Sequence, residues 1–333
     1  MKLLITGGAG FIGINLINNL VKLKLNIIVV DKLTYASNKK EIFKLTKNKN
    51  IYLEKVDITS KKIISELINK HKPDKILNLA AESHVDNSIK KSNDFIKTNI
   101  IGTFNLLECS LDYYKQLSSK LKKTFVFYHI STDEVYGDLK KKDKPFVETS
   151  RYLPSSPYSA TKASSDHLVR AWGRTYNLPY LISNCGNNFG PFQNNEKLIP
   201  TIISKIINNK KIPIYGKGDQ IRDWIYVDDH VSAIKKILFS KIRNETFNIG
   251  AGNELKNIII AKKICSYLDI KSSKKNKKIN KSSELINYVS DRPGHDYRYA
   301  INSNKIRNKL KWKPKISFDE GLKKTINWYL DNL

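Results

Sequence analysis

The chain has 333 residues and 40% hydrophobic content, which is enough to bury a large core, and its length predicts two lobes rather than one. Its formal net charge of +28 raises the question of nucleic-acid binding. The excess is mostly lysine and is spread along the whole chain, which favours a solvated surface. We therefore expect no nucleic-acid partner, although such a charge would steer small anions towards the protein.

The three cysteines, Cys109, Cys185 and Cys265, show no metal-binding spacing, and their odd number gives no complete disulfide framework. We expect no metal site and a reducing compartment, the cytoplasm. Met1 and Lys2 lead into a short apolar run, and no apolar stretch approaches the roughly 18 residues that a membrane-spanning helix needs. The sequence therefore predicts a soluble protein without a leader or a membrane partner.

A glycine-rich turn follows the first predicted strand, residues 2–6, and precedes an amphipathic helix. Its glycines, in Gly7-Gly8-Ala9-Gly10-Phe11-Ile12-Gly13, let backbone N–H groups approach a pyrophosphate at the helix N-terminus, where the helix dipole favours negative charge. A second strand, 26–30, leads to Asp31, 18 residues after Gly13, which is the expected position of an acid that binds a ribose 2′-hydroxyl. Because an acid repels a 2′-phosphate, NAD is favoured over NADP, and only the adjacent Lys32 argues the other way.

Further buried strands are predicted at residues 51–56, 75–79 and 125–130. Ala80 and Ala81 are small enough to let a dinucleotide lie close to the backbone. His84 follows at the same sheet edge, where a catalytic role and ordinary loop hydrogen bonds are both open, and we favour the loop role. Residues 93–117 show the apolar period of a helix.

The chemistry is expected in residues 131–137, after the strand 125–130, and at the start of a helix that contains Tyr158 and Lys162. Open α/β sheets bind ligands at this edge. The two side chains are four residues apart and share one face of the helix. An ammonium beside a phenol, with a cationic nicotinamide, would supply the roughly 4 kcal/mol that moves a tyrosine pKa from about 10 towards 7. The alternative is a chance pairing of two abundant residues, against which the glycine turn argues.

Strands alternate with helices up to about residue 185, which predicts an α/β fold with a doubly wound parallel (Rossmann) sheet. Proline and glycine then interrupt the chain, and residues 222–229 return to a strand-then-helix pattern. We predict a smaller, interleaved α+β substrate lobe, so that the NAD-binding domain comprises 1–187 plus 222–245 and the nucleotide-sugar domain 188–221 plus 246–333. Residues 271–283 are predicted to be a solvated loop, and residues 306–333 to end the chain in packed helices.

These motifs together resemble the extended short-chain dehydrogenase/reductase superfamily, and within it the dTDP-glucose 4,6-dehydratase family. The likeness extends over nearly the whole chain, in residues 6–13, 80–88, 131–137, 158–172, 184–200, 218–230 and 291–301. The distinguishing residues are Thr132-Asp133-Glu134, because related epimerases carry small or neutral residues where this chain has two acids.

The resemblance implies a dehydration in which a tightly bound NAD is regenerated in each cycle. Oxidising a glucose C4 hydroxyl makes the C5 proton acidic, and loss of water across C5 and C6 then needs a base beside an acid. Tyr158 would take the C4 hydroxyl proton, Lys162 would tune Tyr158 and bind ribose, and Thr132 would hold O4. Glu134 would remove the C5 proton, and Asp133, kept protonated by its paired carboxylate, would donate to the leaving C6 hydroxyl. Alternatively, the two acids point to opposite sides of the backbone and never share a site.

The resemblance also implies two sets of ligand contacts. The cofactor residues are Gly7, Gly10, Phe11, Ile12, Gly13, Asp31, Lys32, Leu33, Thr34, Asp57, Ile58, Leu79, Ala80, Ala81, Ser83, Thr98, Tyr158, Lys162 and Asn188. The nucleotide-sugar residues are Ser83, Thr132, Asn187, Glu196, Lys197, Leu198, Pro213, Tyr215, Arg222, Asn257, Arg292 and His295. The two arginines make physical sense here, because guanidinium groups match phosphate oxygens bidentately.

The expected substrate is dTDP-glucose, on a route to deoxysugars of the rhamnose type. The expected assembly is a homodimer joined through the helices near 93–117 and 158–177. Another nucleotide-sugar enzyme of the superfamily, a UDP-glucose 4-epimerase or a UDP-glucuronate decarboxylase, is the nearest alternative. A non-catalytic, nucleic-acid-binding Rossmann protein is a remote alternative that the net charge alone suggests.

Overall fold

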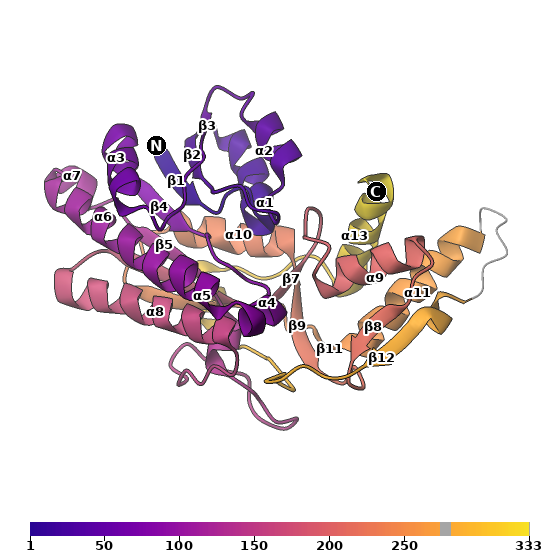
Figure 1. Cartoon of the computed structure of the whole chain (residues 1–333). Coiled ribbons are helices and arrows are strands. Elements are labelled where there is room, and N and C mark those ends of the chain that lie inside the picture. Colours follow the sequence, from indigo (N-terminus) through magenta and orange to yellow (C-terminus); the bar gives the residue numbers. More distant parts are fainter. Residues whose placement is uncertain (274–280, 333) are drawn as a thin grey trace.

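A computed structural model describes residues 1–273 and 281–332, which are built around a seven-stranded parallel sheet (Figure 1). The strand order is β10-β6-β5-β4-β1-β2-β3, with β1 Lys2–Thr6, β2 Asn26–Val30, β3 Ile51–Glu54, β4 Lys75–Asn78, β5 Phe127–Thr132, β6 Tyr180–Cys185 and β10 Glu245–Ile249. The chain runs outward from β1 to β3 and then returns to β4 on the other side of β1. The predicted doubly wound sheet is confirmed, and the reversal between β1 and β4 marks the edge where such sheets bind ligands.

Helices cover both faces of this sheet, because successive side chains of a buried strand point to opposite sides. Leu3 and Ile5 of β1 pack on the face covered by α1 (Phe11–Leu20), α2 (Lys39–Leu45), α10 (Val227–Leu238) and α12 (Asn304–Leu310). Leu4, between them, packs on the face covered by α3 (Lys61–His71), α6 (Gly102–Gln116) and α8 (Pro157–Tyr176). These two cores hold the carboxyl edge of the sheet in place.

The helix predicted over residues 93–117 is divided in the structure. It consists of α5 (Ser92–Phe95), a π-helical segment η2 (Ile96–Ile101) and α6. In the π-helical segment, the Asn99 side chain accepts from the Glu82 backbone N–H at 2.9 Å and donates to the Thr161 hydroxyl at 2.9 Å. The segment is therefore helical as predicted, and the wider turn of η2 fastens the loop after β4 to α8.

Shorter segments connect these elements: η1 (Val21–Leu23), α4 (Val85–Lys90), α7 (Ser119–Lys122) and the 3₁₀ turn η3 (Asp133–Tyr136). β5 starts two residues later than predicted and continues through Ser131 and Thr132, because these residues pair with β6. The strand predicted at 51–56 ends at Glu54. Thr132 is therefore the last residue of β5, and both acids that follow it lie in η3.

A smaller lobe lies beside the carboxyl edge of the main sheet (Figure 1, right). It contains the sheet β11-β9-β7, the two-stranded sheet β12-β8 and four helical segments; the bounds are β7 Asn187–Phe189, α9 Leu198–Ile207, β8 Ile212–Tyr215, β9 Ile221–Tyr226, β11 Glu254–Lys256, α11 Asn257–Ser273, η4 Ser282–Leu285, β12 Ile286–Val289 and α13 Phe318–Asn332. Two details differ from the predicted boundaries: β10 belongs to the main sheet although it extends past residue 245, and β9 pairs within the small lobe. The division into two domains stays a prediction.

The prediction of a solvated loop over residues 271–283 is wrong at both ends of that range. Residues 271–273 are the last turn of α11, and Ser282 is buried, with its backbone N–H and hydroxyl both bound to the Asp269 carboxylate. Residues 274–280 lie outside the described part. Near the C-terminus, Trp312, Phe318 and Leu322 are buried as expected. No helix in the described ranges has the length and apolar content that crossing a bilayer requires.

Candidate active site

The glycine turn between β1 and α1 is too tight for a side chain at Gly7 or Gly13. Gly7 has φ +67°, and a Cβ there would lie 2.6 Å from the backbone nitrogen of Ala80. A Cβ on Gly13 would lie 2.6 Å from the Gly7 carbonyl oxygen. The turn therefore brings backbone N–H groups to the N-terminus of α1, as a pyrophosphate site requires.

A cavity of about 110 Å³ lies beside this turn, and we name it the Lys32 cavity. Asp31, at the end of β2, is fixed at its rim. Its carboxylate accepts from the Ala9 backbone N–H at 3.0 Å, the Leu33 backbone N–H at 2.8 Å and the Ser37 hydroxyl at 3.1 Å. A carboxylate has about four lone-pair directions, so one acceptor position remains for a ribose hydroxyl.

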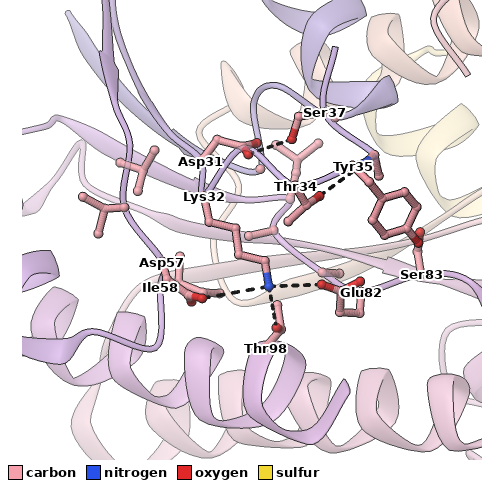
Figure 2. Close-up of a pocket in the computed structure, with 18 of the residues that line it drawn as sticks. Asp31, Lys32, Thr34, Tyr35, Ser37, Asp57, Ile58, Glu82, Ser83 and Thr98 are labelled. Atoms are coloured by element: carbon pink, nitrogen blue, oxygen red, sulfur yellow. Dashed lines mark hydrogen bonds and ion pairs between the residues drawn. The ribbon is translucent and has the colours of Figure 1, made fainter. Parts of the chain in front are cut away.

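Lys32 extends across this cavity rather than towards the ribose position (Figure 2). Its ammonium lies 3.1 Å from Glu82, 3.9 Å from Asp57 and 3.4 Å from the Thr98 hydroxyl. Because two carboxylates already compensate its charge, Lys32 is poorly placed to attract a 2′-phosphate. Lys32 was the residue that argued for NADP, and its ion pairs with Glu82 and Asp57 remove that argument.

A second cavity, of about 270 Å³, continues from the first and shares Gly7, Leu79 and Ser83 with it. We name it the Tyr158 cavity. The two cavities together bring to one edge every predicted cofactor residue except Leu33. Leu33 has φ +58° and packs against the core below the sheet edge, so that only its backbone N–H serves the site, through Asp31.

The five predicted catalytic residues all line the Tyr158 cavity: Thr132, Asp133, Glu134, Tyr158 and Lys162. Thr132 ends β5, and its hydroxyl accepts from the Glu134 backbone N–H at 3.3 Å, which starts the 3₁₀ turn η3. Both acidic residues of this turn line the same cavity. This arrangement favours a shared site over the alternative, in which the two acids point to opposite sides of an extended backbone.

Burial raises the pKa of both acids above the ordinary value of each. The pKa of Asp133 is raised well above its usual range, first by burial and then by the negative charges of Glu134 and Asp223. Its Oδ2 is buried without a hydrogen-bond partner among the described residues. Burial also raises the pKa of Glu134, which Arg292, Arg222 and Lys197 oppose. Burial therefore favours the protonated form of both acids, and more strongly that of Asp133.

The expected effect of Lys162 on Tyr158 stays a prediction, and the hydrogen bonds that Lys162 makes within the described residues go to β5. The Lys162 ammonium donates to the Ile130 carbonyl at 2.8 Å and lies 3.2 Å from His129 Nε2. The pKa of Tyr158 is raised, first by burial and then by Glu134, while a hydrogen bond with Thr132 opposes the rise. A positive charge brought into the cavity would favour the phenolate.

The predicted nucleotide-sugar residues fall into two groups. Ser83, Thr132, Asn187, Glu196 and Lys197 line the Tyr158 cavity. The remainder lie outside its lining, on the small lobe or the loop that follows β12: Leu198, Pro213, Tyr215, Arg222, Asn257, Arg292 and His295.

Four residues of this outer group are engaged in contacts within the protein: Tyr215, Arg222, Arg292 and His295. Asp86 accepts from the Tyr215 hydroxyl at 2.8 Å and from Arg292 at 3.2 Å. Arg222 is 4% exposed and donates three hydrogen bonds to backbone carbonyls, which leaves two of the five N–H groups of a guanidinium. His295 lies 2.6 Å from Asp291.

Sequence reasoning missed several residues of the site. Glu82 compensates Lys32, and Tyr35 joins the two lobes by donating to Glu196 at 3.1 Å. Neither residue has a motif of its own, although both directly adjoin predicted contacts. His84 makes the ordinary loop hydrogen bond that we favoured over a catalytic role. Its Nδ1 accepts from the Asn87 backbone N–H at 3.2 Å and caps α4.

Comparison with known proteins supports the same assignment. The chain matches the family model for GDP-mannose 4,6 dehydratase over residues 4–325. A dTDP-glucose 4,6-dehydratase of Escherichia coli is 50% identical over 341 residues, which cover 100% of this chain and 94% of the relative. The enzyme of the same name from Neisseria meningitidis serogroup B is 48% identical over 332 residues, with 99% and 94% covered.

A solved structure agrees in fold over the same length. DesIV, a dTDP-glucose 4,6-dehydratase from Streptomyces venezuelae determined with NAD bound, is 36% identical and superposes with a TM-score of 0.90 over 100% of this chain and 98% of that chain. The chain therefore belongs to the dTDP-glucose 4,6-dehydratase family of the extended short-chain dehydrogenases/reductases.

Proposed function

We propose that Thr132, Asp133, Glu134 and Tyr158 carry out the conversion of dTDP-glucose to dTDP-4-keto-6-deoxyglucose, with NAD as the resident cofactor. The observation that supports these roles is that one cavity is lined by two acids and one tyrosine, and that burial raises the pKa of one acid more strongly than that of the other. A 4-epimerase has no step for a second acid. Elimination of water needs both a base and an acid at neighbouring carbons.

The residues present fit NAD for two reasons. The glycine turn has no room for a Cβ at Gly7 or Gly13, so its backbone can approach a pyrophosphate, and the Asp31 carboxylate has one acceptor position left for a ribose hydroxyl. When bound, NAD takes the hydrogen of C4 with its two electrons and returns them to C6. Its positive nicotinamide ring favours the Tyr158 phenolate, which takes the proton of the C4 hydroxyl. The Thr132 hydroxyl, next to that phenol, holds O4 in place.

The elimination then divides between the two residues of η3. Glu134, with three cations nearby that oppose its protonation, is the side chain suited to remove the C5 proton. Asp133, more strongly buried in negative surroundings, keeps its proton and donates it to the departing C6 hydroxyl. The cations Lys197, Arg222 and Arg292, which surround Glu134, are positioned to meet the diphosphate.

We also propose a cytoplasmic homodimer that buries the outer face of the π-helical segment and α8. Ile96 and Ile101 are 45% and 46% exposed there, and Tyr176 at the end of α8 is 48% exposed. Analytical ultracentrifugation of Ile96→Lys with Ile101→Lys tests this, because two charges on the face should yield a monomer. A dimer of unchanged stability would exclude this face.

Glucose nucleotides deuterated at C4 test the reaction class. We expect the label at C6 of a 4-keto-6-deoxy product, with dTDP-glucose preferred over the UDP and CDP forms. Label that returns to C4 would indicate an epimerase, and Asp133→Asn with Glu134→Gln would then stay active. Salt-sensitive retention on DNA without turnover of any sugar nucleotide would support the nucleic-acid alternative instead.

A further inference from the structure

His129 lies behind the reacting side chains, in a buried polar network to which the dehydration assigns no role. It lies on β5, three residues before Thr132, and is 1% exposed. Its Nε2 lies 3.2 Å from Lys162 Nζ and 3.5 Å from Asp166 Oδ1, and its Nδ1 lies 3.1 Å from the amide nitrogen of Asn78. Polar groups buried this deeply are rarely retained without partners, because each unpaired one is costly.

The contacts of Lys162 define the direction of its free N–H. An ammonium has three N–H groups in a tetrahedral arrangement. One donates to the Ile130 carbonyl at 2.8 Å, and a second faces His129 Nε2 at 3.2 Å. Because Lys162 also lines the Tyr158 cavity, the third N–H is the one left for the cavity, and the first two fix where it points.

We propose that His129 is a positioning residue that holds Lys162 so that its third N–H is directed at the cofactor ribose and the phenol of Tyr158. The proposal rests on the proposed function for the identity of what that N–H meets. The ring nitrogen that faces Lys162 also lies 3.5 Å from Asp166 Oδ1, which has no other hydrogen-bond partner among the described residues, and the far nitrogen Nδ1 faces Asn78. Asp166 Oδ2 is fixed by Tyr152 at 2.8 Å and Asn184 at 3.1 Å.

A histidine suits this position because it can pair with both protonation states of Lys162. Beside the ammonium, Nε2 accepts and the ring proton sits on Nδ1, which requires the Asn78 amide to turn so that its Oδ1, which here accepts from the Thr6 hydroxyl at 2.7 Å, faces the ring in place of its nitrogen. Beside the free amine, the ring proton sits on Nε2. Burial keeps the ring neutral, because it lowers the pKa of His129, and the nearby cations Lys162 and Arg170 lower it further.

The same environment sets the titration of Lys162. Burial lowers the pKa of Lys162 to about 8, while Asp166 on α8 and Cys185 on β6 oppose that fall. Tyr158, on the same helix, lines the cavity that Lys162 faces. Because the ammonium is the form that binds ribose, activity should fall as the pH rises through the Lys162 pKa. Loss of the His129 acceptor would lower that pKa further.

Two amide substitutions separate the two sides of the ring. In His129→Asn the amide occupies the position of Nδ1 and retains the contact with Asn78, but it is too short to reach Lys162. In His129→Gln the amide occupies the position of Nε2 and offers Lys162 an acceptor oxygen. We expect His129→Asn to bind NAD about tenfold more weakly and to shift the basic limb of C4 oxidation down by about one pH unit, with recovery of both in His129→Gln.

Tyr128→Phe is the matched control. Tyr128 precedes His129 on β5, is fully buried, and donates from its hydroxyl to Ser183 at 3.0 Å on the opposite face of the sheet. We expect this variant to lose stability but to keep the NAD affinity and the pH profile of the wild type. If His129→Asn also loses only stability, or if His129→Gln fails to restore NAD binding, the positioning role is refuted.

The binding and turnover readouts distinguish failure of this proposal from failure of the proposed function. Equilibrium NAD binding is measured without a sugar nucleotide, whereas the C4 label reports on the reaction. If the label shows no transfer to C6 in the wild type while NAD binding still depends on the residue at 129, the function is wrong and the positioning role stands. Normal transfer in the wild type with identical NAD binding in both amide variants refutes the positioning role alone.

Discussion

Replacing Glu134 with glutamine tests the division of labour between the two acids, because it removes a charge and changes the shape very little. The amide cannot take the C5 proton, and general-base catalysis of this kind contributes about 10²–10⁴-fold, or roughly 3–5 kcal/mol. Oxidation at C4 needs Tyr158 and not Glu134. We therefore expect overall turnover to fall by about 10²–10⁴-fold while reduced nicotinamide accumulates.

The structure adds a second effect of the same substitution, with a definite sign. After burial, the charge of Glu134 is the largest cause that raises the Tyr158 pKa. A negative charge disfavours the phenolate, so a neutral amide at 134 lowers that pKa. The phenolate is then more populated at a given pH, and the rising limb of C4 oxidation moves to lower pH.

Stopped-flow absorbance of reduced nicotinamide measures both effects across a pH series. Glu148→Gln is the matched control, because Glu148 lies outside the lining of both cavities and holds the Asn248 backbone N–H at 2.9 Å. It should change neither the turnover nor the pH profile. Full dehydration by Glu134→Gln, or an unshifted profile of C4 oxidation, would refute the assignment of Glu134.

Three further predictions concern residues around the site. Asp223→Asn removes a charge that raises the pKa of Asp133, so the protonated Asp133 is lost at lower pH and the basic limb of dehydration, measured by product formation, should move down. Glu82→Gln frees one partner of Lys32, and NADP binding by titration should improve about tenfold, while unchanged discrimination would contradict the role of this pair. Gly137→Ala places a Cβ 2.2 Å from a backbone oxygen at φ +91°, and thermal unfolding should show a loss of about 2–4 kcal/mol, with an unshifted midpoint as the opposing result.

Local sequence patterns predicted most of the main sheet. The apolar runs that became β1, β2 and β4 are too short and too continuous for helices, and the glycines of residues 7–13 have few uses other than a tight phosphate-binding turn. The pair Tyr158 and Lys162 followed from helical spacing alone. These features depend on residues close together in the chain, which is why the sequence alone sufficed.

The electrostatic predictions depended on contacts between distant segments. Lys162 was expected to act on Tyr158 from the same helix, but β5 supplies the Ile130 carbonyl and His129, which take the ammonium first. Lys32 argued for NADP until Glu82, which lies 50 positions later in the chain, was found beside it. Spacing shows which residues share a helix face, but it does not show which partners the rest of the fold brings to them.

The sequence by itself determined the type of fold and the dinucleotide turn, because each is encoded in a short periodic or contiguous pattern, whereas the roles of the reacting side chains were implied by the family resemblance and stay predictions. Only the tertiary structure showed that both acidic residues of η3 line one cavity, that burial raises the pKa of Asp133 more strongly than that of Glu134, and that Lys162 lies 3.2 Å from a buried histidine. The physical reason is that charge and hydrogen bonding in a buried site depend on distance and desolvation, which arise only when β5, β9 and α8 come together.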